Sequence, residues 1–264
     1  MTKIACGDCS VVKYTDLKND YYSITFRAFS HVLNCRPGQF VHLGLKNSNL
    51  LFRRAFSIAA IDRDKQEMEL IFKVFGRATR QMGQLRKGDV VSILGPLGKP
   101  FTFPKKSETT IIVAGGVGFP PLLFMARAMI DAGHEPGSIW FFYGGRSSAD
   151  IIETSRIRKL GVRFMPVTED GSSGKKGLVT GPVEKVIHES GGKSLRLYGC
   201  GPEGMLKAVD ELGRKFQIPG ELALEAPMPC GIGVCLGCVV KRTDGGHSRV
   251  CIDGPVFAIG EIQL

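Results

Sequence analysis

The chain has 264 residues, of which 43% are hydrophobic and 23% are charged, a composition typical of a globular protein long enough for two domains. Its formal net charge of +10 suits a nucleic-acid surface, but lysine and arginine are spread along the chain in runs no longer than two, so we expect no nucleic-acid partner. No apolar run approaches the roughly 18 residues of a membrane span, and the first residues lack the apolar core of a signal peptide. We therefore expect a cytoplasmic protein, without a membrane segment, whose thiols stay reduced.

Residues 1–104 contain short β-prone runs separated by glycine, proline, asparagine and aspartate. The runs are YYSITFRAF, QFVHLGL, AFSIAAI, EMELIFKVF and DVVSILGPLG. Short runs at such regular spacing are typical of a small barrel or sandwich. We expect one antiparallel β domain here.

Residues 105–222 alternate between strand-like and helix-like segments. TTIIV, SIWFFYGGR, RFMPVTEDG and SLRLYGCGP are strand-like, whereas FPPLLFMARAMIDAG and PEGMLKAVDELGRKF have helical character. This alternation predicts a parallel sheet covered by helices on both faces. The expected fold class is therefore a multi-domain β plus α/β protein, with a short cysteine-rich domain in residues 223–264.

The C-terminal region contains four of the eight cysteines. They follow the spacing C-x4-C-x2-C-x12-C and are Cys230, Cys235, Cys238 and Cys251. The first three reproduce the plant-type spacing of a [2Fe–2S] cluster held by thiolates. The glycines between them allow a loop to turn sharply around a small cluster, and freed backbone amides can then donate to the sulfurs.

Two other interpretations of these cysteines remain open. A structural zinc site is usually built from two closely spaced ligand pairs, whereas this region has one C-x2-C pair and no second one. Four inert buried thiols are the third possibility. Cys6 and Cys9 form another C-x2-C pair that stands alone, and we expect no cluster ligand there. Cys200, in the turn YGCGP, could border a cofactor.

Two glycine-rich turns follow expected strands of the α/β region. AGGVGFPPL contains Gly115, Gly116 and Gly118, and YGCGPEGM contains Gly199 and Gly201. Glycines let the backbone approach a phosphate, and the following helix presents its positive end. Neither turn is the strict G-x-G-x-x-G fingerprint, but both lie at the carboxyl ends of strands, where open α/β sheets bind ligands. Together they predict a nucleotide site.

These features occur in an order that resembles the ferredoxin–NADP reductase superfamily. The residues that carry the resemblance are R-x-F-S and G-x-x-T in the β region, then GGVG…PPL and YGCGPEGM. Members of that superfamily have a flavin-binding β-barrel before a nucleotide-binding α/β domain. The C-terminal CGIGVCLGCVV…VCIDGPVF is similar to the electron-transfer subunits of dihydroorotate dehydrogenase B, and this likeness extends over essentially the whole chain.

The resemblance implies three cofactors: FAD, a [2Fe–2S] cluster on the four cysteines, and NAD at the glycine turns. It assigns FAD binding to Arg54, Ala55, Phe56, Ser57, Ile71, Phe72, Lys73, Ala78 and Thr79. The chain departs from the common pattern at three of these positions. Phe56 stands where tyrosine is frequent, Ala55 where proline is frequent, and Ala78 where glycine is frequent. We expect FAD to bind with an altered potential.

The activity implied by the resemblance is an electron relay. An FMN-containing catalytic subunit oxidises dihydroorotate in pyrimidine biosynthesis, and electrons pass through the cluster and FAD to NAD+ in a heterotetramer of two plus two chains. No catalytic acid or base is expected. Arg146 and Asp150 leave the choice between NADP and NAD open, and the resemblance favours NAD. The alternatives are a small subunit of a ferredoxin-linked NAD(P)H transhydrogenase or sulfide dehydrogenase, and a non-catalytic iron–sulfur redox sensor.

Overall fold

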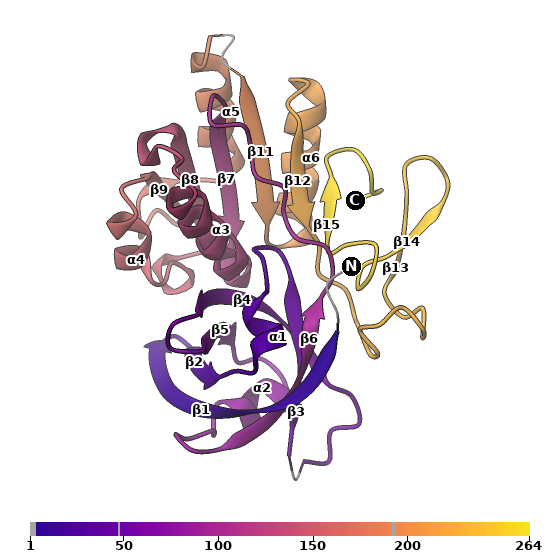
Figure 1. The fold of residues 1–264 in the computed structure, drawn as a ribbon. Coiled ribbons are helices and arrows are strands. Elements are labelled where there is room, and N and C mark those ends of the chain that lie inside the picture. The colour runs from indigo at the N-terminus through magenta and orange to yellow at the C-terminus, as the bar shows by residue number, and fades with distance from the viewer. Residues whose placement is uncertain (1–3, 47, 192–193) are drawn as a thin grey trace.

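The computed structural model describes residues 4–46, 48–191 and 194–264. Six antiparallel strands close into a barrel in the order β1-β2-β5-β4-β3-β6 (Figure 1). The barrel elements are β1 (Ala5–Lys18), β2 (Tyr21–Arg27), α1 (Ser30–Leu33), β3 (Phe40–Leu45), β4 (Arg54–Asp62), β5 (Glu67–Lys73), α2 (Arg77–Met82) and β6 (Val90–Leu97). Closure leaves no unpaired strand edge around the ring.

Five of the six barrel strands match the runs predicted from the sequence, and β1 was not predicted. The fourteen residues of β1 bury only two side chains, Cys9 and Val11. An apolar alternation is therefore almost absent from this segment. Its extended conformation is set by pairing with β2 on one side and β6 on the other. Tertiary pairing thus decides a strand that local pattern does not indicate.

A seven-stranded sheet follows the barrel, in the order β10-β9-β8-β7-β11-β12-β15 (Figure 1). Its strands are β7 (Thr109–Gly115), β8 (Ile139–Gly145), β9 (Arg163–Thr168), β10 (Lys175–Lys176), β11 (Leu195–Cys200), β12 (Gly220–Ala223) and β15 (Val256–Ala258). The connecting elements are η1 (Gly116–Gly118), α3 (Phe119–Asp131), η2 (Pro136–Ser138), η3 (Ser148–Asp150), α4 (Thr154–Lys159), α5 (Thr180–Glu189) and α6 (Glu203–Lys215). All neighbouring strands are parallel except β12 and β15.

The central strand β7 shows why this sheet is covered on both faces. Ile112 and Ala114 belong to one apolar cluster, together with residues of α3, whereas Ile111 and Val113 belong to another, together with residues of α5 and α6. Successive side chains of a strand point to opposite faces, so an uninterrupted apolar run needs helices on both sides. The predicted α/β architecture is confirmed.

The cysteine segment is tied to the edge of this sheet. After β12 the chain leaves the sheet, forms the hairpin β13 (Val239–Lys241) and β14 (His247–Arg249), and returns as β15, antiparallel to β12. The amide of Lys99, which follows the barrel, donates to the carbonyl of Gly254 at 2.5 Å. The segment therefore lies beside both the barrel and the sheet (Figure 1).

Barrel and sheet are joined by charged and apolar contacts. Arg156 of α4 donates two hydrogen bonds to the carboxylate of Glu69 on β5, at 2.7 and 2.8 Å. Tyr21 of β2 is buried in the same apolar cluster as α3. This bidentate pair and the shared core fix the relative orientation of the two units. None of the helices in the described part of the chain combines the length and apolar character needed to span a membrane.

Candidate functional site

The hairpin β13–β14 brings two of the predicted ligands together. Cys238 precedes β13 and Cys251 follows β14, and the amide of Val250 donates to the carbonyl of Cys238 at 3.0 Å. The two sulfur atoms lie 3.3 Å apart in the interior. Burial, followed by the hydrogen bond and charge of Cys238, raises the pKa of Cys251 to about 12. The hairpin closes the twelve-residue gap in the motif.

The other two predicted ligands lie on a surface loop whose amides point at sulfur. The amide of Cys235 donates to the sulfur of Cys230, and the amide of Gly237 to the sulfur of Cys235, both at 3.5 Å. Burial opposes ionisation of Cys230, but the amides of Cys235 and Ile232 outweigh it and lower its pKa to about 6. Such amides stabilise thiolates in general, whether free or bound to metal.

The backbone of the loop requires its glycines. Gly231 and Gly233 have φ values of +70° and +79°, a region that side-chain-bearing residues rarely adopt. The four predicted ligands form two pairs. Cys230 and Cys235 lie on the loop, and Cys238 and Cys251 lie in the interior. No three potential ligands among the described residues are arranged to hold a single metal ion. An all-thiolate donor set fits a [2Fe–2S] cluster, and the C-x4-C-x2-C spacing within this set is typical of the cluster rather than of zinc.

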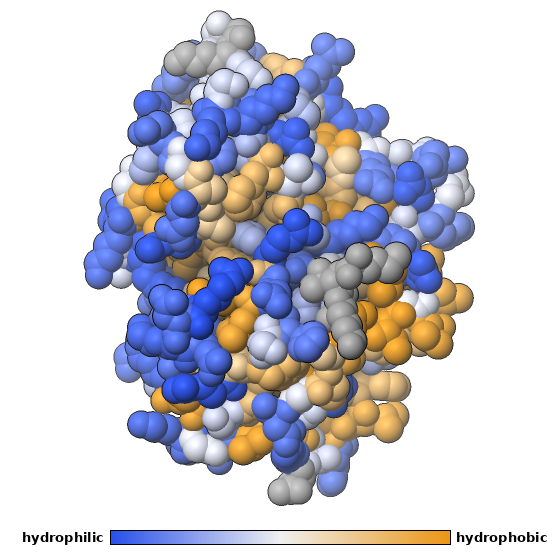
Figure 2. Space-filling model, in the orientation of Figure 1, coloured by the Kyte–Doolittle hydropathy of each residue, from blue (hydrophilic) through white to orange (hydrophobic). Residues whose placement is uncertain are grey.

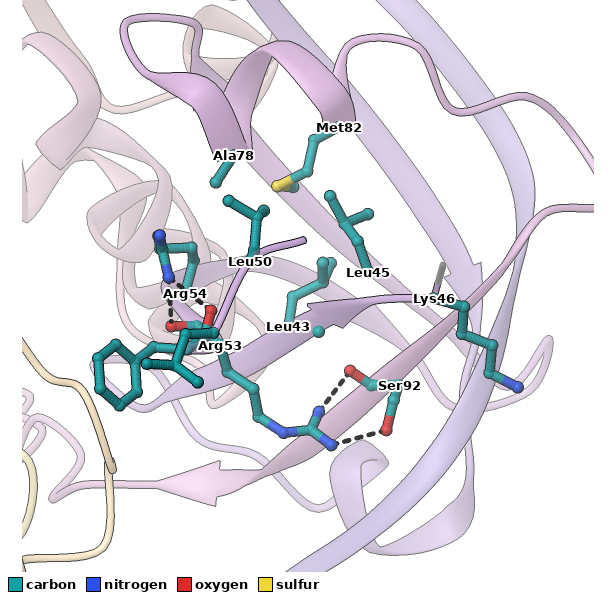
Figure 3. Close-up of a pocket in the computed structure, with 12 residues that line it drawn as sticks. Leu43, Leu45, Lys46, Leu50, Arg53, Arg54, Ala78, Met82 and Ser92 are labelled. Carbon is teal, nitrogen blue, oxygen red and sulfur yellow. Dashed lines mark hydrogen bonds between the residues drawn. The ribbon is translucent and has the colours of Figure 1, made fainter. Parts of the chain in front are cut away.

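Two of the expected flavin residues, Arg54 of β4 and Ala78 of α2, meet at one pocket of about 160 Å³ (Figure 3). The other expected residues of these two elements do not line it: Ala55, Phe56, Ser57 and Thr79. Arg54 and Ala78 line it together with Leu43, Leu50 and Met82. The guanidinium of Arg54 donates to two nearby carbonyls, which leaves it at the pocket wall. The structure thus brings a cation and a helix start together, an arrangement suited to a pyrophosphate.

Other expected flavin residues, among them Thr79 and Phe72, use their side chains for hydrogen bonds and packing within the fold. The hydroxyl of Thr79 accepts from the amides of Phe75 and Gly76 at 3.1 and 3.0 Å and so caps α2. The side chains of Ile71 and Phe72 are buried, and Phe72 packs edge-on against Phe56 at 5.9 Å. A ligand at Ile71 and Phe72 would therefore contact their backbone atoms.

A larger cavity of about 570 Å³ lies at the carboxyl ends of the sheet strands. Gly115 and Gly116 line it, as do Pro202, which precedes α6, and Gly204 in the first turn of α6. The barrel contributes Tyr21 and Lys73 to the same cavity. This is where open α/β sheets bind ligands, and it lies between the two units.

Three of the five predicted glycines, Gly118, Gly199 and Gly201, do not line this cavity. A Cβ on Gly118 would lie 2.3 Å from the carbonyl oxygen of Cys200, and a Cβ on Gly201 would lie 2.6 Å from Cε of Met205. A Cβ on Gly199 would lie 2.7 Å from a methyl of Leu222. The observed role of these glycines is close packing of β7, β11 and α6.

Asp150 connects the cavity to the barrel. Its carboxylate accepts from Nζ of Lys73 at 3.0 Å, from the hydroxyl of Tyr21 at 3.5 Å and from the amide of Arg146 at 3.2 Å. Burial opposes ionisation of Asp150, but Lys73 outweighs it and holds the pKa below its ordinary value. The Arg146 side chain is 81% exposed, and its Nε lies 3.7 Å from the same carboxylate. Asp150 is therefore committed to an interdomain ion pair.

Comparison with known proteins agrees with this arrangement. Residues 8–101 match the model of the oxidoreductase FAD-binding domain, residues 112–211 that of the oxidoreductase NAD-binding domain, and residues 225–263 that of the iron–sulfur cluster binding domain of dihydroorotate dehydrogenase B. The dihydroorotate dehydrogenase B (NAD(+)) electron transfer subunit of Shouchella clausii is 34% identical, covering 98% of each chain. The chain belongs to the family of dihydroorotate dehydrogenase B electron transfer subunits. The corresponding subunit of Caldanaerobacter subterraneus is 37% identical, covering 86% of each chain.

Solved structures support the fold of this family member. A chain of an NADH-dependent reduced ferredoxin-NADP oxidoreductase superposes with a TM-score of 0.84 at 27% identity, covering 97% of this chain and 89% of that one. The ferredoxin NADP+ reductase of Neisseria gonorrhoeae gives a TM-score of 0.68 at 16% identity, covering 80% and 91%. The predicted combination of a flavin-binding barrel, a nucleotide-binding α/β domain and an iron–sulfur domain is confirmed.

Sequence reasoning missed two residues that the structure places at these sites. Tyr21 reaches the nucleotide cavity from the first turn of the barrel, and His42 of β3 lies buried beneath the cysteine loop. Neither belongs to a motif, because each becomes adjacent to its site only when segments distant in sequence pack together. A histidine flanked by the apolar residues Val41 and Leu43 in QFVHLGL was the one available signal.

Proposed function

We propose that this chain carries electrons from an FMN-containing dihydroorotate dehydrogenase catalytic subunit, through a [2Fe–2S] cluster and FAD, to NAD+ in pyrimidine biosynthesis. The observation that carries the proposal is the position of the cysteine loop. Gly231 packs against His42 of β3, and β3 pairs with β4, the strand of Arg54 and Ser57. In this proposal the strand β3 lies between the cluster site and the flavin residues of β4.

Within this proposal the chain's own residues hold the three cofactors. Cys230, Cys235, Cys238 and Cys251 are the cluster ligands, with amides of the loop donating to two of the sulfurs. Arg54 and Ala78 at the start of α2 face FAD, and Gly115 and Gly116 approach NAD. FAD, when bound, supplies hydride chemistry on one side and single-electron transfer on the other. The predicted ranges 1–104, 105–222 and 223–264 remain our proposed domain boundaries.

The loop also offers a surface for a partner subunit. Four apolar side chains of the loop are exposed: Ile232 by 45%, Val234 by 75%, Leu236 by 60% and Val239 by 39%. Figure 2 shows hydrophobic surface gathered along the edge that the cysteine segment occupies in Figure 1. Contiguous exposed apolar surface marks interaction sites. We infer that the catalytic subunit covers this loop, in a cytoplasmic complex of two plus two chains.

The test combines cofactor analysis with reconstitution. Anaerobically purified chain should contain about two irons and two sulfides, one FAD and no zinc. It should reduce dyes with NADH, yet form NADH from dihydroorotate only after the catalytic subunit is added. Val234→Asp should impair reconstitution while leaving NADH–dye activity intact. Zinc without sulfide would exclude the electron relay. Turnover of dihydroorotate by the single chain would show that no catalytic subunit is needed and would contradict the proposal.

A second candidate is a subunit of an NADH-dependent ferredoxin–NADP oxidoreductase. The TM-score of 0.84 to a chain of such an enzyme favours this candidate. The exposed Arg146, which follows β8, also favours it, because a cation there would suit the 2′-phosphate of NADP. Reduction of NADP+ by reduced ferredoxin, with no response to the dihydroorotate dehydrogenase catalytic subunit, would select this candidate.

A further inference from the structure

His42 lies at the junction between the barrel and the cysteine loop. It is 0% exposed, although histidine is a polar residue. On β3 it faces Ala55 of β4 and Leu94 of β6, and the neighbouring Val41 and Leu43 belong to the barrel core. The alternation along a strand therefore directs His42 out of the barrel, toward the C-terminal segment.

The imidazole of His42 lies directly against the residue that follows the first predicted ligand. A Cβ built on Gly231 would lie 2.6 Å from Cε1, 2.8 Å from Nε2 and 2.9 Å from Nδ1 of His42. The part of the ring that carries both nitrogens thus faces the loop. Two features require glycine at position 231: its φ of +70°, and the imidazole ring that occupies the space a Cβ would need.

Neither ring nitrogen of His42 has a hydrogen-bond partner among the residues the structure describes. A buried donor left unpaired costs about 1–3 kcal/mol, so such groups normally have a partner. Burial, followed by the charges of Arg53 and Arg54, lowers the pKa of His42 to about 4. An imidazole has at least one N–H to donate in either protonation state.

We propose that His42 is a positioning residue of the iron–sulfur site, which donates its N–H to a sulfur atom of the cluster bound by Cys230 and its partners. This inference rests on the proposed function, because it requires the cluster. Sulfur is the acceptor on this side, since thiolates and bridging sulfides carry negative charge and Gly231 is bonded to Cys230. On the flavin side the neighbour of His42 is the methyl group of Ala55, which accepts nothing.

Such a hydrogen bond has a defined consequence for redox behaviour. A reduced cluster has one more negative charge than an oxidised cluster, so a donor at its sulfur stabilises the reduced form and raises the reduction potential. His42 would thereby adjust the cluster relative to the flavin from a position between them. A histidine that only fills space would leave the potential unchanged when replaced by a side chain of similar volume.

The first experiment is pulsed electron paramagnetic resonance on the reduced, holo wild-type chain with histidine labelled by ¹⁵N. We expect a ¹⁵N coupling to the cluster that persists in His247→Gln, which removes the histidine of β14. A chain that contains iron and sulfide but shows no histidine coupling overturns this inference and leaves the proposed function standing. A chain without iron and sulfide overturns both.

The second experiment is a redox titration of variants with confirmed cofactor content. His42→Leu should shift the cluster midpoint to lower potential, His42→Gln should restore much of the shift because its amide still donates, and His188→Gln on α5 should match wild type. An unchanged midpoint in His42→Leu overturns the inference, and so does a shift confined to FAD. If His42→Leu binds no cluster, the ¹⁵N coupling in the labelled wild-type chain tests the inference.

Discussion

The cysteine loop and the nucleotide cavity are built in opposite ways. All four thiols come from residues 230–251, and one hairpin closes the gap between the third and the fourth. The cavity, by contrast, is lined by Tyr21 and Lys73 of the barrel as well as by turns after β7, β8, β9 and β11. A site made by one loop can be recognised from spacing, whereas a site made by two packed units depends on their docking. Substitutions in each of the two regions test that difference.

The largest effect is expected from Cys235→Ala in the loop. Because Cys235 is exposed, its side chain contributes little to packing, but a missing thiolate should abolish the cluster. Iron and sulfide should fall from about two of each per chain to near zero, with FAD and NADH–dye activity retained. Cys6→Ala, also exposed, is the matched control and should keep the cluster. Full iron and sulfide in Cys235→Ala would refute the ligand assignment.

The next largest effect is expected from Gly118→Ala, which destabilises the sheet and leaves the cysteine loop unchanged. In Gly118→Ala the new methyl group would lie 2.3 Å from a backbone oxygen of Cys200, which cannot move without disturbing β11. We expect a loss of about 3 kcal/mol of unfolding free energy. Gly116→Ala meets no atom within 4 Å and has a φ of +51°, so it should lose only about 1 kcal/mol.

Denaturant unfolding followed by tryptophan fluorescence measures the effect of Gly118→Ala. The single tryptophan, Trp140, lies on β8 and therefore reports on this sheet. Equal losses in the two glycine variants would show that the contact with Cys200 does not matter. An altered iron content in Gly118→Ala would show that the loop and the sheet are less independent than we argue.

A smaller effect is expected at the ion pair between barrel and sheet. Asp150→Asn removes the charge that faces Lys73 at 3.0 Å and should cost about 1 kcal/mol near pH 7. The folded pKa of Asp150 is depressed, so its contribution is present above the unfolded value of about 3.9 and is lost as pH falls through the folded pKa. The difference between wild type and variant should therefore shrink as pH falls below about 3.9.

The pH dependence of Asp150→Asn is checked by denaturant unfolding at several pH values. Asp131→Asn is the control, because the pair between Asp131 and Arg127 is exposed on α3 and should contribute little at any pH. A difference between wild type and Asp150→Asn that grows as pH falls would contradict the assigned direction of the pKa shift.

The smallest effect is expected from Phe56→Tyr in β4. Phe56 packs edge-on against Phe72, and the added hydroxyl restores the residue common at this position in the superfamily. FAD affinity, measured by flavin fluorescence on titration of apoprotein, should change by less than about threefold, because such substitutions rarely exceed about 0.5 kcal/mol. A tenfold change would mean that the hydroxyl has a specific partner at the flavin site.

Much of the fold was predictable because its elements have strong local signals. The apolar run of β7 and the alternating β2 and β5 indicate their own conformations. The strand β1 was not predictable, since its two buried side chains give no period and its partners impose its shape. The edge strand β15 was missed for a related reason: three residues become a strand only because β12 offers an open edge.

For the candidate sites, the sequence by itself determined the cluster motif and the order of the three cofactor-binding regions. Spacing suffices there, because the sulfur atoms and the amides that face them belong to one short loop. Only the tertiary structure decided which glycines line the cavity, that Asp150 pairs with Lys73, and that His42 lies beneath Gly231. Those relations join residues far apart in the chain, and such contacts arise from the packing of whole units rather than from any local pattern.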